Sequence, residues 1–282
     1  MVLNKNKKAV VIAAAVIFIA AVTVSVFVIN NRKTQKEISQ YLQNPPDLYG
    51  ELCIIADSAE VDKNRYSVAG FKETVRLGAD TVTLDICFDS DGTPVVCRDF
   101  DDTTDSSLRL EQILELIAGD EEYSAVNLNL RLRQLNTLET LNSLLQKYQV
   151  ESRVIISGID RDRYSLISGD DTCANLFFDY EVTGSAEKST AEIAQLQKEY
   201  NISGVIIDAK KLDAELAQSL VQNGIQFIVS GTDSDIEIYR VLSIGANLIQ
   251  TNSPERLNEI YEDWKKSALS QMDKSIADSL KQ

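Results

Sequence analysis

The chain of 282 residues contains no histidine, and this absence limits its chemistry more than any other feature of the composition. With a pKa of about 6.5, histidine is the side chain best suited to exchanging a proton at neutral pH. Acid–base catalysis by an imidazole is therefore excluded, and so is any metal site that requires histidine ligands.

Positive charge is also scarce, because 28 lysine and arginine residues face 43 aspartate and glutamate residues and the net charge is −15. Nucleic acids and anionic lipid surfaces attract proteins through basic patches. The charge balance therefore excludes nucleic acid as the expected partner and argues against adhesion to an anionic lipid surface.

Cysteine is present only four times, at Cys53, Cys87, Cys97 and Cys173. Their spacing does not match a zinc site, and each lies in or beside an apolar run. We therefore expect buried, small apolar side chains. Disulfides are permitted outside the membrane, but Cys87 and Cys97 are expected to point to different faces of their strands.

Long uncharged runs are absent except near the N-terminus, where residues 9 to 29 contain 21 consecutive residues without a charge. A helix of about 20 apolar residues spans the roughly 30 Å hydrocarbon core of a bilayer. The run is too long for the apolar region of a cleaved signal peptide, which is the alternative, and its end is a poor cleavage site.

The sequence therefore predicts a single-pass protein of the cell membrane, with its C-terminal domain outside the cytoplasm. The expected divisions are a cytoplasmic tail (1–8), a transmembrane helix (9–29), a polar juxtamembrane spacer (30–50), one large domain (51–270) and a C-terminal helical tail (271–282).

Eight short apolar runs alternate with amphipathic helical patterns along the large domain, as in a parallel sheet covered by helices. Eight such units predict an α/β fold, a (β/α)₈ TIM-type barrel. An open doubly wound sheet is the alternative, but no Gly-x-Gly-x-x-Gly turn follows the first run. The expected strands are 52–57, 80–88, 125–132, 153–158, 175–180, 203–209, 225–230 and 246–251.

A second apolar stretch follows the second strand after an Asp-Gly turn, in "FDSDGTPVVCRD" (88–99). This pattern predicts an inserted β-hairpin. Asp89 and Asp91 resemble the beginning of a calcium loop, but they lack the glutamate that ends one, so we interpret them as turn residues.

Reactive groups in such barrels lie at the C-terminal ends of the strands and in the loops that follow. The candidates at these positions are Asp57, Thr83, Asp85, Arg98, Asn129, Arg131, Ser157, Asp179, Asp208, Ser230 and Asn252. For Asp179 and Asp208, a helix cap or a loop hydrogen bond is the simpler interpretation.

The stretch "IIADSAE" (54–60) followed by "SVAGFKETVRLGADTVTLDICFDSDGTPVVCRDF" (67–100) resembles the opening of the glycerophosphodiester phosphodiesterases. These enzymes belong to the phospholipase-C-like phosphodiesterase superfamily of TIM-type barrels. The resemblance continues through "VNLNLRL", "VIISGID", "GIQFIVSGTDSD" and "LSIGANLIQTNSPERL", so it covers almost the whole large domain.

The resemblance also implies which groups have been lost. The two family histidines correspond to Asp57 and Arg98, and three family metal ligands to Thr83, Asp85 and Asn129. A basic residue is kept as Arg131, and a family tryptophan corresponds to Ser230. Only Asp85 retains its family character as a metal ligand.

Neither Asp57 nor Arg98 suits proton exchange at neutral pH, because their ordinary pKa values are about 3.9 and above 12. Catalytic residues are therefore not expected. The main expectation is that the chain binds no cofactor. If a calcium or magnesium site is retained, Asp85 would form it, with Asp57 as a second carboxylate.

The barrel mouth, formed by the C-terminal ends of the strands and the loops that follow, keeps several polar groups. They predict ligand binding by Arg98, Arg131, Asn129 and Ser230, because arginine binds phosphate or carboxylate without transferring a proton. The alternative for both arginines is a salt bridge to Asp57, Asp85 or Asp99.

Three hypotheses follow. The first is an inactive, membrane-anchored barrel that binds a phosphate-bearing small molecule or a protein partner. The second is a divergent metal-dependent phosphoric diester hydrolase that acts on glycerophosphodiesters or related lipid head groups, with a site rebuilt from Asp57, Asp85, Arg98 and Arg131. The third is a structural surface protein without a small-molecule site.

Overall fold

The computed structural model describes residues 31–43, 46–57, 66–98, 107–134, 138–165 and 175–279, with the side chains of 271–279 left aside. The predicted transmembrane helix 9–29, Cys173 and Asp99 lie outside these residues. Within them, no helix combines the length and the apolar composition needed to cross a membrane.

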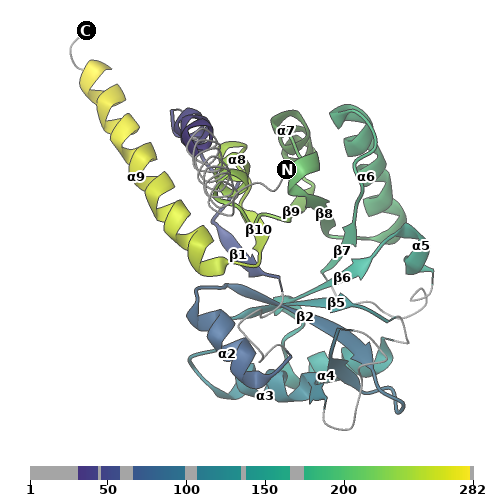
Figure 1. The fold of residues 1–282 in the computed structure, drawn as a ribbon. Coiled ribbons are helices and arrows are strands. Elements are labelled where there is room, and N and C mark those ends of the chain that lie inside the picture. Colours follow the sequence, from purple (N-terminus) through teal and green to yellow (C-terminus); the bar gives the residue numbers. More distant parts are fainter. Residues whose placement is uncertain are drawn as a thin grey trace, which may run out of the picture.

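Eight parallel strands form a closed barrel, as predicted (Figure 1). The first barrel strand pairs with both the last and the second, which closes the sheet and rules out the open alternative. The strands are β1 (Cys53–Ala56), β2 (Thr81–Phe88), β5 (Asn127–Leu132), β6 (Val154–Ile159), β7 (Leu176–Asp179), β8 (Gly204–Asp208), β9 (Gln226–Ser230) and β10 (Leu248–Thr251).

The predicted hairpin is confirmed, since β3 (Pro94–Val96) runs antiparallel to β2 and a short β4 (Leu108–Arg109) pairs with β3. Asp89 closes the turn, because its Oδ1 accepts hydrogen bonds from the backbone of Asp91 at 3.0 Å and of Thr93 at 2.8 Å. Asp89 therefore acts as a turn residue, as predicted.

Helices surround the barrel (Figure 1), and several begin where a serine or aspartate side chain caps the first turn. The short α5 was not expected from the sequence. The helices are α2 (Val68–Arg76), α3 (Leu110–Gly119), α4 (Glu139–Tyr148), α5 (Arg161–Tyr164), α6 (Ala186–Tyr200), α7 (Ala214–Gln222), α8 (Asp235–Ser243) and α9 (Pro254–Ser279), with 3-10 turns η2 (Glu151–Arg153) and η3 (Ala209–Lys211).

The alternation of side chains along β2 and β5 separates the outer core from the barrel interior. Leu84 and Leu130 face outward into the large core between strands and helices. The interior contains a smaller apolar cluster of Ile55, Phe177 and Ile228. The inward positions of β2 and β5 carry polar groups, which form the candidate site.

Two helical segments flank the barrel in the sequence, residues 31–41 before β1 and α9 after β10. Residues 31–41 are helical, and Ile38 is buried in the same core as the barrel helices. At the other end α9 continues without a break to Ser279, and Figure 1 shows its C-terminal part running away from the barrel. Trp264 on α9 is buried and packs in the core between the strands and the helices.

Cys87 and Cys97 correct one expectation. They share a buried cluster with Val95, and the Cys87 thiol lies 3.6 Å from the backbone oxygen of Cys97. The pairing of Cys87 with Val95 explains this, because Val95 and Cys97 are two residues apart and face the same side. Among the described residues, Cys53, Cys87 and Cys97 are thiols outside any disulfide.

Candidate functional site

The site begins with the strand register, which places Asp85 of β2 beside Arg131 of β5 and Thr83 beside Asn129. Arg131 in turn pairs with Ser157 of β6. Three neighbouring strands therefore present their inward side chains at matched heights near the carboxyl ends, where barrel sites form.

An ion-pair network lies at the upper level of this arrangement. Nε of Arg131 donates to Oδ1 of Asp85 at 2.6 Å, and its Nη1 donates to Oδ1 of Asp57 at 2.6 Å. Nε of Arg133 donates to the same Asp85 oxygen at 2.7 Å. The salt bridge that was the alternative for Arg131 is thus present, with two of the three predicted carboxylates; the third, Asp99, lies outside the described residues.

Asp85 is completely enclosed and remains charged because of these arginines. Burial alone would raise the pKa of Asp85, but the hydrogen bonds and charges of Arg131 and Arg133 outweigh it and place the pKa below its ordinary value. Burial would lower the pKa of Arg131, yet its two carboxylate partners raise it.

Tyr66 completes the surroundings of Asp85, since its hydroxyl donates to Oδ2 at 3.2 Å. Its backbone has a φ of 61°, the left-handed region that a bulky residue rarely adopts. Tyr66 and Arg133 were not among the predicted site residues. Tyr66 lies just before α2, where the family resemblance has an asparagine instead, and Arg133 lies one residue beyond the end of β5.

A neutral hydrogen-bond chain lies one level deeper in the barrel. Ser157 Oγ donates to Asn129 Oδ1 at 2.7 Å, and Asn129 Nδ2 donates to Thr83 Oγ1 at 3.2 Å. All three side chains are buried. Asn129, a predicted ligand-binding residue, is therefore placed within the barrel wall rather than on an open surface.

Thr83, Asp85 and Asn129, the positions that the sequence resemblance assigns to metal ligands, do not fit a divalent cation. Thr83 and Asn129 are bonded to each other, and both oxygens of Asp85 already accept hydrogen bonds from protein donors. A calcium or magnesium ion requires several free oxygen ligands. Among the described residues, no three Asp, Glu or Cys side chains gather as a metal site.

Gly158 allows β6 to approach β5 closely next to this network. Its φ is +77°, and an added Cβ would lie 2.7 Å from the backbone oxygen of Leu132 and 3.0 Å from Cγ of Arg131. Arg163 of α5 ties the strand ends together, because its guanidinium donates to the backbone oxygens of Gly158 and Leu132.

Two adjoining cavities flank the network on the side of β7, β8 and α6. A cavity of about 530 Å³ lies between β7 and α6, and one of about 590 Å³ extends toward β8 and β9. Asp160, Asp179, Tyr180 and Glu181 line both. Ser230 lines the larger cavity, which is where the structure places this predicted ligand residue.

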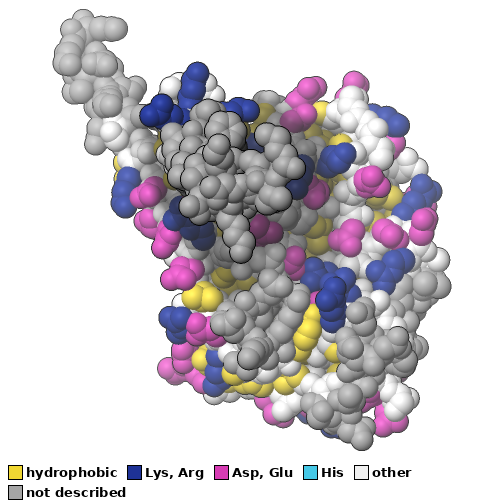
Figure 2. All heavy atoms as spheres, in the orientation of Figure 1, with side chains coloured by type: hydrophobic (Ala, Val, Ile, Leu, Met, Phe, Trp, Pro, Cys, Tyr) yellow, Lys and Arg dark blue, Asp and Glu magenta, His cyan; other side chains and the backbone are white. Residues whose placement is uncertain are grey.

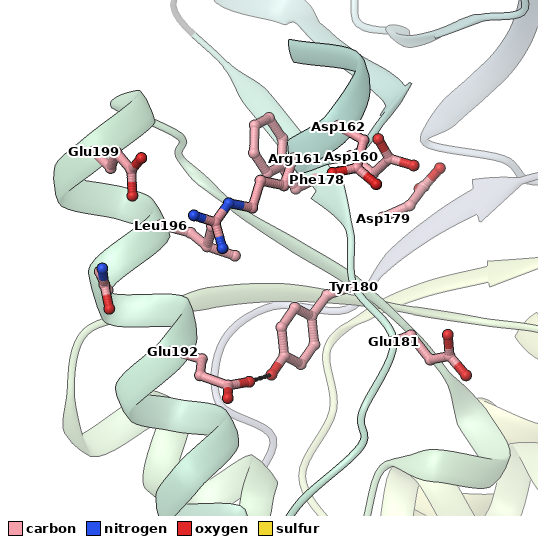
Figure 3. Close-up of a pocket in the computed structure, with 11 residues that line it drawn as sticks. Asp160, Arg161, Asp162, Phe178, Asp179, Tyr180, Glu181, Glu192, Leu196 and Glu199 are labelled. Atoms are coloured by element: carbon pink, nitrogen blue, oxygen red, sulfur yellow. Dashed lines mark hydrogen bonds between the residues drawn. The ribbon is translucent and has the colours of Figure 1, made fainter. Parts of the chain in front are cut away.

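The cavity beside α6 is strongly acidic, and Figure 3 shows Asp160, Asp162 and Asp179 near one another at one end of it. At the other end the Tyr180 hydroxyl donates to Glu192 at 2.8 Å. Burial, together with this acceptor, raises the pKa of Tyr180 to about 12. An anion would be repelled from this cavity.

Asp179 is exposed to the mouth and caps no helix, so the simpler interpretation of it is not confirmed. Partial burial of the Asp179 carboxylate raises its pKa, and the positive charges of Arg131 and Arg163 oppose this increase. Asp208 does take the simpler role, because its Oδ1 accepts from the Lys210 backbone at 2.8 Å and caps η3.

Charge is thus divided across the mouth. Figure 2 shows basic side chains gathered over strands β5 and β6, with acidic side chains between this group and α6. Arg98 is exposed just after β3. Asn252 is held by Asp233, at 3.0 Å through its side chain, and belongs to a separate loop contact.

Comparison with known proteins gives a result for structure alone. By sequence, no family model and no curated protein match the chain. By structure, its neighbours are glycerophosphodiester phosphodiesterases, which are TIM-type barrels.

The glycerophosphodiester phosphodiesterase from Agrobacterium tumefaciens is 12% identical at a TM-score of 0.60, over 76% of this chain and all of that one (100%). A phosphodiesterase from Oleispira antarctica, solved with the product sn-glycerol-3-phosphate, is 13% identical at 0.59, over 74% and 96%. A protein from Galdieria sulphuraria, assigned to the same enzymes, is 14% identical at 0.64, over 77% and 100%. At these identities the similarity establishes the fold.

Proposed function

We propose that this chain is a membrane-anchored, extracytoplasmic domain that has kept the glycerophosphodiester phosphodiesterase fold, lost its catalysis and serves to bind a phosphate-bearing ligand or a protein partner. The fold and the charged barrel mouth support binding. The uncharged segment 9–29 supports the anchor.

One observation carries the loss of catalysis. Asp57, which stands where the resemblance places one family histidine, and Asp85, which stands at a family metal-ligand position, are both held in an ion-pair network with Arg131 and Arg133. Both carboxylates in this network are therefore neutralised by guanidinium groups. Losing one catalytic acid or base lowers a rate by about 10²- to 10⁴-fold. Here both histidine positions of the resemblance are changed, to Asp57 and Arg98.

The test is hydrolysis of glycerophosphodiesters by the purified chain, with calcium or magnesium and with an active phosphodiesterase of the same fold as the positive control. We expect no turnover above buffer. Metal-dependent turnover that survives repurification and disappears in Asp85→Ala would contradict the proposal.

A divergent phosphoric diester hydrolase remains the second candidate, and Asp179 is the observation that favours it. Its carboxyl group has a raised pKa, is open to both cavities and lies within the electrostatic influence of Arg131. A carboxyl group of this kind is the type that serves as a general acid. Turnover abolished by Asp179→Asn would support this candidate.

A further inference from the structure

The two arginines at the end of β5 differ in how much of their hydrogen-bonding capacity the protein uses. Arg131 donates through Nε and Nη1 to two different carboxylates, and its side chain is 18% exposed. Arg133 donates through Nε alone, and its side chain is 39% exposed. The two side chains therefore have different capacity for a ligand.

The terminal nitrogens of Arg133 have no hydrogen-bond partner among the described residues. A guanidinium fixed through Nε presents Nη1 and Nη2 as a planar pair of donors, which matches two oxygens of a phosphate group. Asp85 holds this guanidinium in place from its inner side.

Neighbouring groups make Arg133 the better candidate than Arg163 or Arg131. Arg163 directs its guanidinium at backbone oxygens of the strand ends. Arg131 is committed to Asp57 and Asp85. Figure 2 shows that basic side chains gather on this part of the face, whereas the cavity beside α6 is acidic.

We propose that Arg133 is the phosphate-binding residue of the barrel mouth, and that it binds phosphate without a divalent cation because Arg131 already neutralises the carboxylates that a metal ion would need. The charges of Asp57 and Asp85 are balanced by the two guanidinium groups, so the network carries no excess negative charge that would repel a phosphate. This inference rests on the proposed ligand-binding function and names the residue and the ligand chemistry.

The experiment is a titration of the full chain in detergent with inorganic phosphate and with dimethyl phosphate, by isothermal calorimetry in EDTA. The two probes distinguish a free phosphate or monoester from a diester. We expect binding of at least one probe in EDTA. When the titration is repeated with calcium in place of EDTA, the affinity should change by less than twofold.

Arg133→Gln should weaken that binding by about ten- to a hundredfold, because a bidentate charge-assisted pair is lost. Arg133→Lys should give an intermediate affinity, since lysine keeps the charge but not the planar donor pair. The matched control is Arg76→Gln, which removes an exposed arginine paired with Glu73 on α2 and should bind as the unchanged chain does.

A second measurement covers the case in which Arg133→Gln does not fold. In the unchanged chain, phosphate should protect Arg133 from an arginine-specific dicarbonyl reagent, and Arg76 should react equally with and without phosphate. No binding of either probe, unchanged binding in Arg133→Gln, loss of binding in EDTA, or equal labelling of Arg133 would overturn the inference. Phosphodiester turnover would instead contradict the proposed function.

Discussion

The hydroxyl of Ser157 donates a hydrogen bond to Oδ1 of Asn129 at 2.7 Å, and both side chains are fully enclosed by the barrel. Because Asn129 also donates to Thr83, three neutral groups on three strands satisfy one another. A buried polar group is tolerated when it is paired and is costly when it is not. The chain of hydrogen bonds therefore satisfies three polar side chains that are buried inside the barrel.

Ser157→Ala should destabilise the fold by about 1–3 kcal/mol, because Oδ1 of Asn129 would lose its donor while it remains buried. The midpoint of denaturant unfolding measures this change. Ser230→Ala is the matched control, since Ser230 is half-buried and makes one longer bond of 3.4 Å to the Ile207 backbone. Equal shifts for the two variants would show that the Ser157 bond has no special weight.

The architecture could be predicted from the sequence because each barrel strand had a clear apolar pattern and the longer helices had a clear period, whereas the four-residue α5 is too short to show one. Gly78, Gly224 and Gly245 follow helices and have positive φ values, the left-handed backbone that glycine adopts without strain. The open sheet was excluded only by the pairing of β1 with β10, a long-range contact that no local pattern encodes.

The site could be predicted in its members but only partly in its connections. Asp85 and Arg131 were both identified, yet their contact depends on the register of β2 against β5, which the closed barrel sets. Arg133 reaches Asp85 from beyond the strand, and Tyr66 does so from a left-handed backbone. Such placements arise from tertiary geometry rather than from sequence period.

Asp85→Asn should destabilise the chain at neutral pH by about 3–5 kcal/mol, since it leaves two guanidiniums without their buried carboxylate. The pKa of Asp85 is lowered in the folded state. Its stabilising effect is therefore complete above the unfolded-state pKa of about 4 and is lost as the pH falls through the lower folded value.

Unfolding free energies of Asp85→Asn and of the unchanged chain, measured between pH 7 and pH 3, check this expectation. The difference between the two proteins should be largest at neutral pH and should shrink in acid. A difference that stays constant over this range would mean that the ion pair does not govern the stability of the network.

Asp179→Asn should have the opposite effect and stabilise the chain at neutral pH. The pKa of Asp179 is raised in the folded state, so its charged form opposes folding once the pH exceeds the unfolded-state value of about 3.9. Because water reaches this carboxylate and screens it, the gain should stay below about 1 kcal/mol.

The same pH series tests Asp179→Asn, and its benefit should vanish near pH 3, where the unchanged chain is protonated at this position. Asp160→Asn is a useful comparison, because Asp160 lines the same cavities but also caps α5 through a 2.8 Å bond to the Arg163 backbone. Loss of stability at neutral pH in Asp179→Asn would contradict the expected sign.

Ile38→Ala should destabilise the whole barrel, although Ile38 precedes the predicted domain boundary at residue 51. Its side chain is 8% exposed and belongs to the core shared with the barrel helices. Truncating a buried isoleucine to alanine costs about 2–5 kcal/mol in a rigid core.

Lys36→Ala, an exposed change on the same helical segment, should shift the stability by less than about 0.5 kcal/mol. If the thermal unfolding midpoint falls only in Ile38→Ala, the segment 31–41 folds as part of the barrel domain. Equal midpoints for the two variants would show that the segment contributes no stability to the barrel.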